Sequence, residues 1–124
     1  MAERISEGEQ AVMEVLWASD RPLTATEVAE RVDPARNWSE RTVKTMLARL
    51  LAKGVLAHEE DGRRYLYRPA VERRAFAAGE SRRLADRLFG GRAAPLVAHL
   101  AERQGGLSAE DIAELEALVR ELKS

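Results

Sequence analysis

Residues 39–54 combine a row of cationic and hydroxyl side chains with a row of apolar side chains. The apolar residues recur at spacings of three and four, so this stretch predicts one helix with a buried face and an exposed face. Glu40 is the only acid on the exposed side. The cationic and hydroxyl side chains of the exposed face are Arg41, Thr42, Lys44, Thr45, Arg49 and Lys53. A cationic face is most often a solvated surface, so the neighbouring elements must decide what it does.

Arginine and threonine cluster in the first turns of this helix, where a recognition helix reaches base edges in a major groove. Lysine and arginine further along such a surface neutralise phosphates. We therefore predict base contacts from the first group below and phosphate contacts from the second. The first group is Arg41, Thr42, Thr45 and Arg49, and the second is Lys44, Lys53, Arg63 and Arg64.

The ends of this helix carry clear signals. Ser39 is a preferred N-cap residue, and Gly54 supplies a left-handed stop. Trp38 and Val43 lie where two apolar side chains pack together across the start of a helix.

Two shorter helices precede it. Ser6 and Glu9 have the spacing of a capping box before a helix expected over 7–18. Thr24 and Glu27 repeat that spacing before a helix expected over 27–32, and Pro34 marks a turn after it. Helix, short helix, turn and cationic helix is the order of a helix-turn-helix.

A β-hairpin is predicted directly after the cationic helix. The runs 55–59 and 64–68 alternate as strands, and they are joined through residues 60–63, in which Asp61-Gly62 predicts a turn with positive φ at both positions. Such a hairpin is the wing of a winged helix, and it would place Arg63 and Arg64 at its tip. We assign residues 1–70 to a winged-helix DNA-binding domain.

Residues 71–124 predict three more amphipathic helices, over 71–89, over 93–104 and after Ser108. The fold class is thus mainly α with a small β-hairpin, a winged helix-turn-helix followed by a helical region. Because a complete winged helix leaves these helices little core to cover, we predict that they form a homodimer. The alternative is that they fold back on their own chain. The predicted dimer contacts are Leu84, Leu88, Phe89, Leu96, Leu100, Ile112, Leu115 and Val119.

Composition excludes several other classes. The 124 residues carry a formal charge of −1, yet residues 36–53 hold five basic side chains against one acid, whereas residues 102–123 hold six acids against three bases. The chain has no cysteine, so disulfides and thiolate metal sites are excluded. The charged start of the chain has no signal-peptide core, and no run is long enough to span a membrane, so we expect a soluble cytoplasmic protein.

Catalysis is not expected. His58 lies beside acids next to the predicted turn and His99 stands alone on a predicted helix, with no nucleophile motif, phosphate loop or set of metal ligands. We predict no enzyme activity, no metal and no cofactor.

With these elements placed, the chain resembles the BlaI/MecI family of bacterial repressors, also called penicillinase repressors, over nearly its whole length. The order and spacing of several short stretches carry the resemblance. They include Leu16-Trp17, Leu23-Thr24-Ala25, Trp38-Ser39 with Arg41-Thr42-Val43-Lys44-Thr45, Gly62-Arg63, Asp86-Arg87-Leu88-Phe89-Gly90-Gly91 and Leu107-Ser108.

The resemblance implies a homodimeric winged-helix repressor on inverted-repeat operators, regulating antibiotic-resistance genes of the β-lactamase type. It also implies relief by proteolysis in the dimerisation helices, signalled through a membrane-bound sensor protease. The bond that aligns with the family's cleavage site joins His99 to Leu100. The family members that are cut have an amide residue followed by an aromatic one there, and this chain departs from that pattern.

Two alternatives stay open at the level of sequence. One is a winged-helix repressor released by a small effector, which needs a pocket that sequence cannot show. The other is a winged-helix module that binds an acidic protein, although such a face would be expected to carry exposed apolar anchors.

Overall fold

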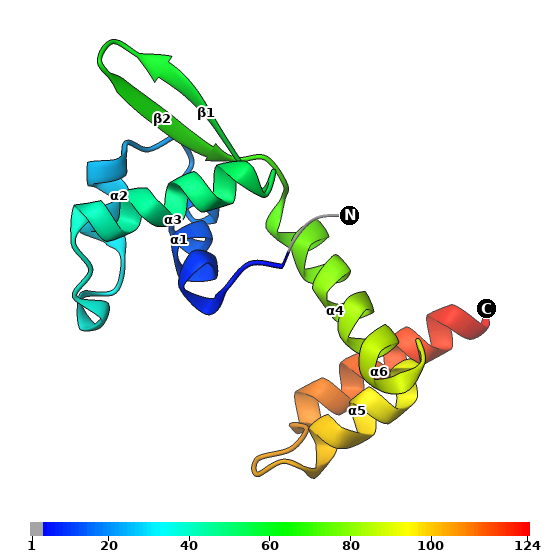
Figure 1. Ribbon diagram of the computed structural model, residues 1–124. Helices are drawn as coiled ribbons and strands as arrows, with labels where there is room; N and C mark the ends of the chain where they lie inside the picture. Colours follow the sequence, from blue (N-terminus) through cyan, green and yellow to red (C-terminus); the bar gives the residue numbers. More distant parts are fainter. Residues whose placement is uncertain (1–3) are drawn as a thin grey trace. The chain divides into compact units, whose positions relative to one another are not determined.

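The computed structural model describes residues 4–124, so the predicted charged start at residues 1–3 lies outside it. The chain divides into two compact units, one running to Phe76 and the other covering Ala77–Ser124 (Figure 1). The first unit holds α1 (Glu7–Trp17), α2 (Ala25–Arg31), the short 3-10 helix η1 (Pro34–Arg36), α3 (Glu40–Ala52), β1 (Leu56–Asp61), β2 (Arg64–Pro69) and the start of α4 (Arg73–Phe89). The second holds the rest of α4, α5 (Ala93–Glu102) and α6 (Ala109–Lys123). The expected class, helices with a single β-hairpin, is confirmed.

The helix starts follow their capping residues. In the box before α1, the amide of Glu9 donates to Ser6 Oγ at 3.1 Å, and the amide of Ser6 donates to Glu9 Oε1 at 2.7 Å. Thr24 and Glu27 form the same box before α2. That helix begins at Ala25, two residues before the predicted start, because helical geometry begins directly after the cap.

The hairpin is tighter than predicted. Asp61 pairs with Arg64 in the register of β1 and β2, so the loop consists of Gly62 and Arg63 alone. The expected link over 60–63 is therefore too long. Positive φ at both Asp61 and Gly62 is also wrong: only Gly62, at φ 69°, has it, as in a type II′ turn with glycine first.

A third extended segment joins the hairpin to the chain before α2. Leu23 and Tyr67 exchange two backbone hydrogen bonds, with N···O distances of 3.0 and 2.7 Å. This bridge fixes the wing against the start of α2.

The core of the first unit lies among α1, α2, α3 and the start of β1. α1 and α3 approach closely at Gly8, where an added Cβ would lie 3.0 Å from Met46 Cε. The buried apolar side chains are Val12, Met13, Leu16, Leu23, Ala25, Val28, Val32, Val43, Leu47, Leu50, Val55 and Leu56.

The start of α4 contacts α1. The indole N–H of Trp17 donates to the carbonyl of Val71 at 2.9 Å, and the Trp17 and Phe76 ring centroids are 5.3 Å apart. Arg73 Nε donates to Glu14 Oε1 at 2.7 Å. Residues 71–76 therefore pack with the first unit, and the division into domains at residues 70 and 71 stays a prediction.

The helices α4, α5 and α6 have no buried side chain. Ser108 and Asp111 form a capping box before α6, yet Leu122 behind it is 76% exposed. Half of the predicted dimer contacts are also exposed, and the other half are partly exposed. The exposed ones are Leu88, Leu100, Ile112 and Val119, and the partly exposed ones are Leu84, Phe89, Leu96 and Leu115. No helix within residues 4–124 is both long and apolar enough to cross a bilayer.

Candidate nucleic-acid interface

The side chains of α3 that pack in the core determine which of its other side chains are exposed. Ser39 Oγ accepts the amide of Thr42 at 3.1 Å and sets the start of the helix. Val43, Leu47 and Leu50 are fully buried. Because side chains three and four residues apart share a face, the intervening residues point away from the core. Arg41, Lys44, Thr45 and Arg49 are accordingly exposed.

The two threonines of this face already use their hydroxyl groups locally. Thr45 Oγ1 donates to the carbonyl of Arg41 at 3.1 Å, and Thr42 Oγ1 lies 3.1 Å from Ser39 Oγ. With its proton committed to the helix, Thr45 offers a ligand an acceptor oxygen and a methyl group. On a base edge these groups suit an amino donor or a thymine methyl.

The wing carries two arginines, of which Arg64 is held by an ion pair and Arg63 is exposed at the loop. Arg64 Nε and Nη2 both donate to Asp61 Oδ2, at 3.2 and 3.1 Å, so that its guanidinium is held across the end of the hairpin. Arg63 occupies the second loop position and is exposed. On the strands behind them, His58 stacks with Tyr67 at 5.9 Å between centroids and meets Tyr65 edge-on at 4.7 Å.

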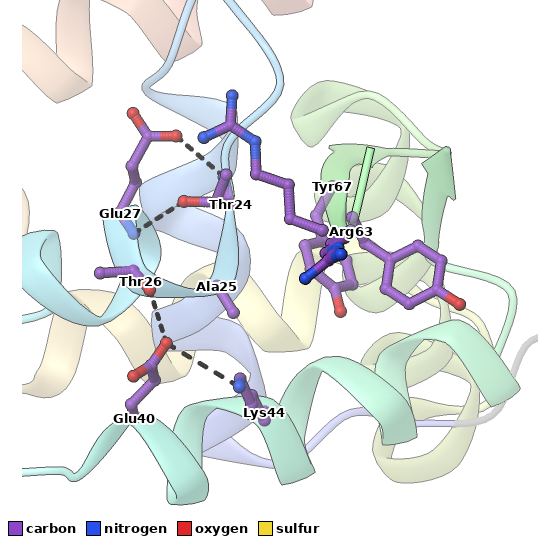
Figure 2. Close-up of a pocket in the computed structure, with 10 residues that line it drawn as sticks. Thr24, Ala25, Thr26, Glu27, Glu40, Lys44, Arg63 and Tyr67 are labelled. Atoms are coloured by element: carbon purple, nitrogen blue, oxygen red, sulfur yellow. Dashed lines mark hydrogen bonds and ion pairs between the residues drawn. The ribbon is translucent and has the colours of Figure 1, made fainter. Parts of the chain in front are cut away.

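A groove lies between the start of α2, the start of α3 and the wing, with a volume of about 720 Å³ (Figure 2). Its cations are Lys44, Arg63 and Arg64, and its aromatic wall is Tyr65 and Tyr67. The remaining lining residues are Thr24, Ala25, Thr26, Glu27 and Glu40. The groove brings three of the predicted phosphate-binding side chains to one surface.

Two carboxylates also line this groove, and neither of them is predicted from the sequence to have a role in binding. Glu27 accepts a 2.6 Å bond from Arg21, and this bond, with the amide of Thr24, lowers its pKa to about 2. Glu40 Oε1 accepts from Thr26 Oγ1 at 2.5 Å and lies 3.9 Å from Lys44 Nζ. Figure 2 draws both contacts as dashed lines. The contact between Thr26 and Glu40 joins residues on two helices, and helix periodicity within either one cannot reveal it.

Lys53 differs from the other predicted DNA contacts. Its Nζ donates to Glu9 Oε1 at 2.6 Å and to the carbonyl of Arg4 at 2.9 Å, and its side chain is 19% exposed. Burial alone would raise the pKa of Glu9, but the bonds from Lys53 and Ser6 outweigh it and lower that pKa. The ion pair gives Lys53 a structural role across 44 positions of sequence, which periodicity could not reveal. Its contact with phosphate stays a prediction.

The histidines do not assemble a site. His99 Nδ1 lies 3.8 Å from Glu102 on the same helix, and its ring is 5.4 Å from that of Phe89. Within residues 4–124 no group of three or more histidine, aspartate or glutamate side chains is placed to hold a metal ion.

Three helices, a two-stranded wing and an exposed cationic third helix define a winged-helix protein, the class that lays such a helix in a major groove. The sequence of the chain is more specific than its fold. A model of the penicillinase repressor family matches residues 5–121, so the chain belongs to that family. It is a DNA-binding transcriptional repressor and not an enzyme.

Curated relatives match over almost the whole chain. The penicillinase repressor of Bacillus licheniformis is 31% identical, with 98% of this chain and 93% of the relative covered. The transcriptional regulator BlaI of Mycobacterium tuberculosis (strain CDC 1551 / Oshkosh) is 35% identical over 92% of this chain and 86% of its own length.

Two solved structures each match more than half of the chain. The DNA-binding domain of the repressor BlaI has a TM-score of 0.52 at 35% identity, covering 59% of this chain and 90% of that one. The monomeric form of BlaI from Bacillus licheniformis, solved in complex with the blaP half-operator, has a TM-score of 0.50 at 34% identity, covering 59% and 88%.

Proposed function

We propose that this protein binds inverted-repeat operators of β-lactamase-type resistance genes as a homodimer and represses them from the cytoplasm. The observation that carries the proposal is the exposed face of α3 beside the wing. Arg41, Lys44 and Arg49 are exposed on that face, and Arg63 is exposed at the wing loop. The relative in complex with a half-operator supports duplex DNA as the ligand.

In this proposal the contacts divide by chemistry. Arg41 has the donors for a bidentate contact with guanine. Thr42, Thr45 and Arg49 contact further base edges along the same major groove of the DNA. Lys44, Arg63 and Arg64 neutralise phosphates, with Lys53 as a further phosphate contact only where its bond to Glu9 permits.

The homodimer is proposed from the apolar side chains that the second unit leaves uncovered. Ile112, Leu118 and Val119 on α6 are each close to half exposed. Next to them is an apolar hollow of about 410 Å³ lined by residues of α6 and by Leu107. A second copy would cover this face, and pairing two half-sites raises affinity without any new base contact.

We further propose that repression is relieved by proteolysis, signalled through a membrane-bound sensor protease. The bond that would be cut joins His99 to Leu100. Both residues lie on α5 and are exposed, with the His99 side chain at 66% and Leu100 at 45%. Cutting α5 would separate the DNA-binding unit from α6 and so remove the avidity of the dimer.

The test is fluorescence anisotropy of the purified protein with DNA from upstream of its own gene and with scrambled DNA, over a salt series. We expect the upstream DNA to bind at least about a thousandfold more tightly, with affinity falling steeply as salt rises. A duplex selected from a random pool serves as a control for an operator elsewhere. Weak, equal binding to all three duplexes would rule the proposal out.

A further inference from the structure

The groove beside the wing has a defined neighbour in any complex of the proposed kind. When α3 lies in a major groove and the wing reaches the adjacent minor groove, one sugar-phosphate strand separates the two. That strand must run over the surface between α3 and the hairpin. In this protein that surface is the groove lined by Lys44, Arg63 and Arg64. The cations suit a phosphate strand, whereas the two carboxylates in the same groove oppose one.

Glu27 is already neutralised. It accepts from Arg21 at 2.6 Å and from the amide of Thr24 at 2.9 Å through Oε1, so its charge is satisfied within the protein. A phosphate strand passing nearby meets an ion pair and not an isolated negative charge.

Glu40 is in a different position. It opens α3, the end of the helix that approaches base edges, and its side chain is 46% exposed. The contacts that the structure gives it, with Thr26 and Lys44, both end on Oε1. Among the described residues, Oε2 therefore has no hydrogen-bond partner. Thr26 holds the carboxylate in place from α2, and the second oxygen stays available.

We propose that Glu40 is a specificity-determining residue, whose carboxylate opposes DNA in general and is satisfied only by a base that presents an amino group. The amino group at cytosine N4 is the donor from which a carboxylate accepts in the major groove. This inference rests on the proposed function and adds to it one position of the operator and the chemistry that reads it.

Glu40 affects DNA affinity differently at a site that presents the amino group (a right site) and at one that does not (a wrong site). At a site with the amino group, Glu40 exchanges water for a charge-assisted hydrogen bond. At a site without it, the carboxylate loses water beside phosphates and gains no donor. Glu40 also competes with phosphate for Lys44. Removing its charge should therefore help wrong sites more than right ones.

Glu40→Gln tests this, because glutamine keeps the shape and can still accept from Thr26. The matched control is Glu110→Gln, which removes the same charge from the first turn of α6. Anisotropy with the selected duplex and with scrambled DNA gives the preference of each variant. For Glu40→Gln we expect scrambled DNA to bind about fivefold more tightly and the preference for the selected duplex to fall by about tenfold. Glu110→Gln should leave the preference unchanged.

Selection from a random pool provides a second readout. Wild-type protein should enrich cytosine at one position where Glu40→Gln does not. An equal change in affinity for both duplexes would reduce Glu40 to a general charge and overturn the inference, as would an unchanged preference or a loss of binding to both. The wild-type curves alone decide the proposed function: a wild type without preference rejects that function, whereas a wild type with preference and a Glu40→Gln variant that keeps it rejects only this inference.

Discussion

The two units of this chain each contain a helix with a complete capping box, but they differ in how far they bury their apolar side chains. Ser6 and Thr24 cap helices of the first unit and Ser108 caps α6, all three through the same capping box. Within residues 4–76 the first unit buries twelve apolar side chains, whereas α4, α5 and α6 bury none. The same capping box therefore starts helices of a closed core in one unit and a helix with an exposed apolar face in the other.

The two units therefore differ in how much hydrophobic stabilisation each gains within a single chain. The first unit gains its stability by removing its own apolar surface from water. In the second unit Leu88, Ile112 and Leu118 keep about half of their surface exposed, so about half of the stabilisation available from burying them is still to be gained. The homodimer that we propose would cover these exposed side chains with a second copy of the same unit.

The largest difference between the two units is expected when one apolar side chain is truncated in each. Leu47→Ala opens a cavity in a fully buried site and should lower the free energy of unfolding by about 2–5 kcal/mol. Leu118→Ala, at 48% exposure, should change that of the monomer by no more than about 0.5 kcal/mol. Both tryptophans, Trp17 and Trp38, lie in the first unit, so their fluorescence during urea unfolding reports on that unit alone. Circular dichroism followed in the same titration reports on the helices of both units and is the measurement for Leu118→Ala. Similar losses for the two variants would show that the second unit is closed as well.

Charged substitutions on α6 test whether its exposed apolar face forms the proposed dimer interface. Replacing Leu115 and Val119 together by glutamate should give a monomer in sedimentation and weaken binding to a two-half-site operator by about a hundredfold. Affinity for a single half-site should not change, since the first unit is untouched. A dimer that survives both substitutions would place the interface elsewhere.

Within the first unit, α3 and the wing should differ in what they read. Arg41→Ala should cost about 1–3 kcal/mol on the operator and relax selection at one base pair. Arg63→Ala should weaken operator and scrambled DNA alike and lower the salt slope by about one. Anisotropy over a salt series measures both quantities. If Arg63→Ala also changed the preferred sequence, the wing would be reading bases.

The smallest expected effect is on the acid stability of the first unit. The bond from Arg73 lowers the pKa of Glu14, and the bond from Arg21 lowers that of Glu27 to about 2, from an unfolded value of 4.5. Because folding lowers these pKa values, the stability they contribute is present above pH 4.5 and is lost as the pH falls towards 2. Tryptophan fluorescence should show the unit losing stability in that window.

Glu27→Gln is the matching variant, since it removes one of these titrations and keeps a side chain that can cap α2. Its stability should be lower than that of the wild type at pH 7 and should fall less between pH 4.5 and 2. A loss as steep as that of the wild type would assign the acid dependence to other carboxyls.

Much of the fold could be predicted from particular residues. Ser39 and the buried spacing of Val43, Leu47 and Leu50 placed α3, and the capping boxes placed α1 and α6. The hairpin loop was predicted too long, because strand pairing extends until the turn itself prevents it, and only the register shows where that occurs. The base-facing and phosphate-facing assignments on α3 and the wing stay predictions that the variants above test.

By itself the sequence determined which segments form helices, which face of each is apolar and where the cations of α3 lie, because these depend on residues within a few positions of one another. Only the tertiary structure decided that Lys53 is bound to Glu9 and that Thr26 holds Glu40 beside Lys44 in the groove. Those contacts join residues that lie 44 and 14 positions apart. Their partners are chosen by how the helices pack, and periodicity along one helix carries no information about the helix packed against it.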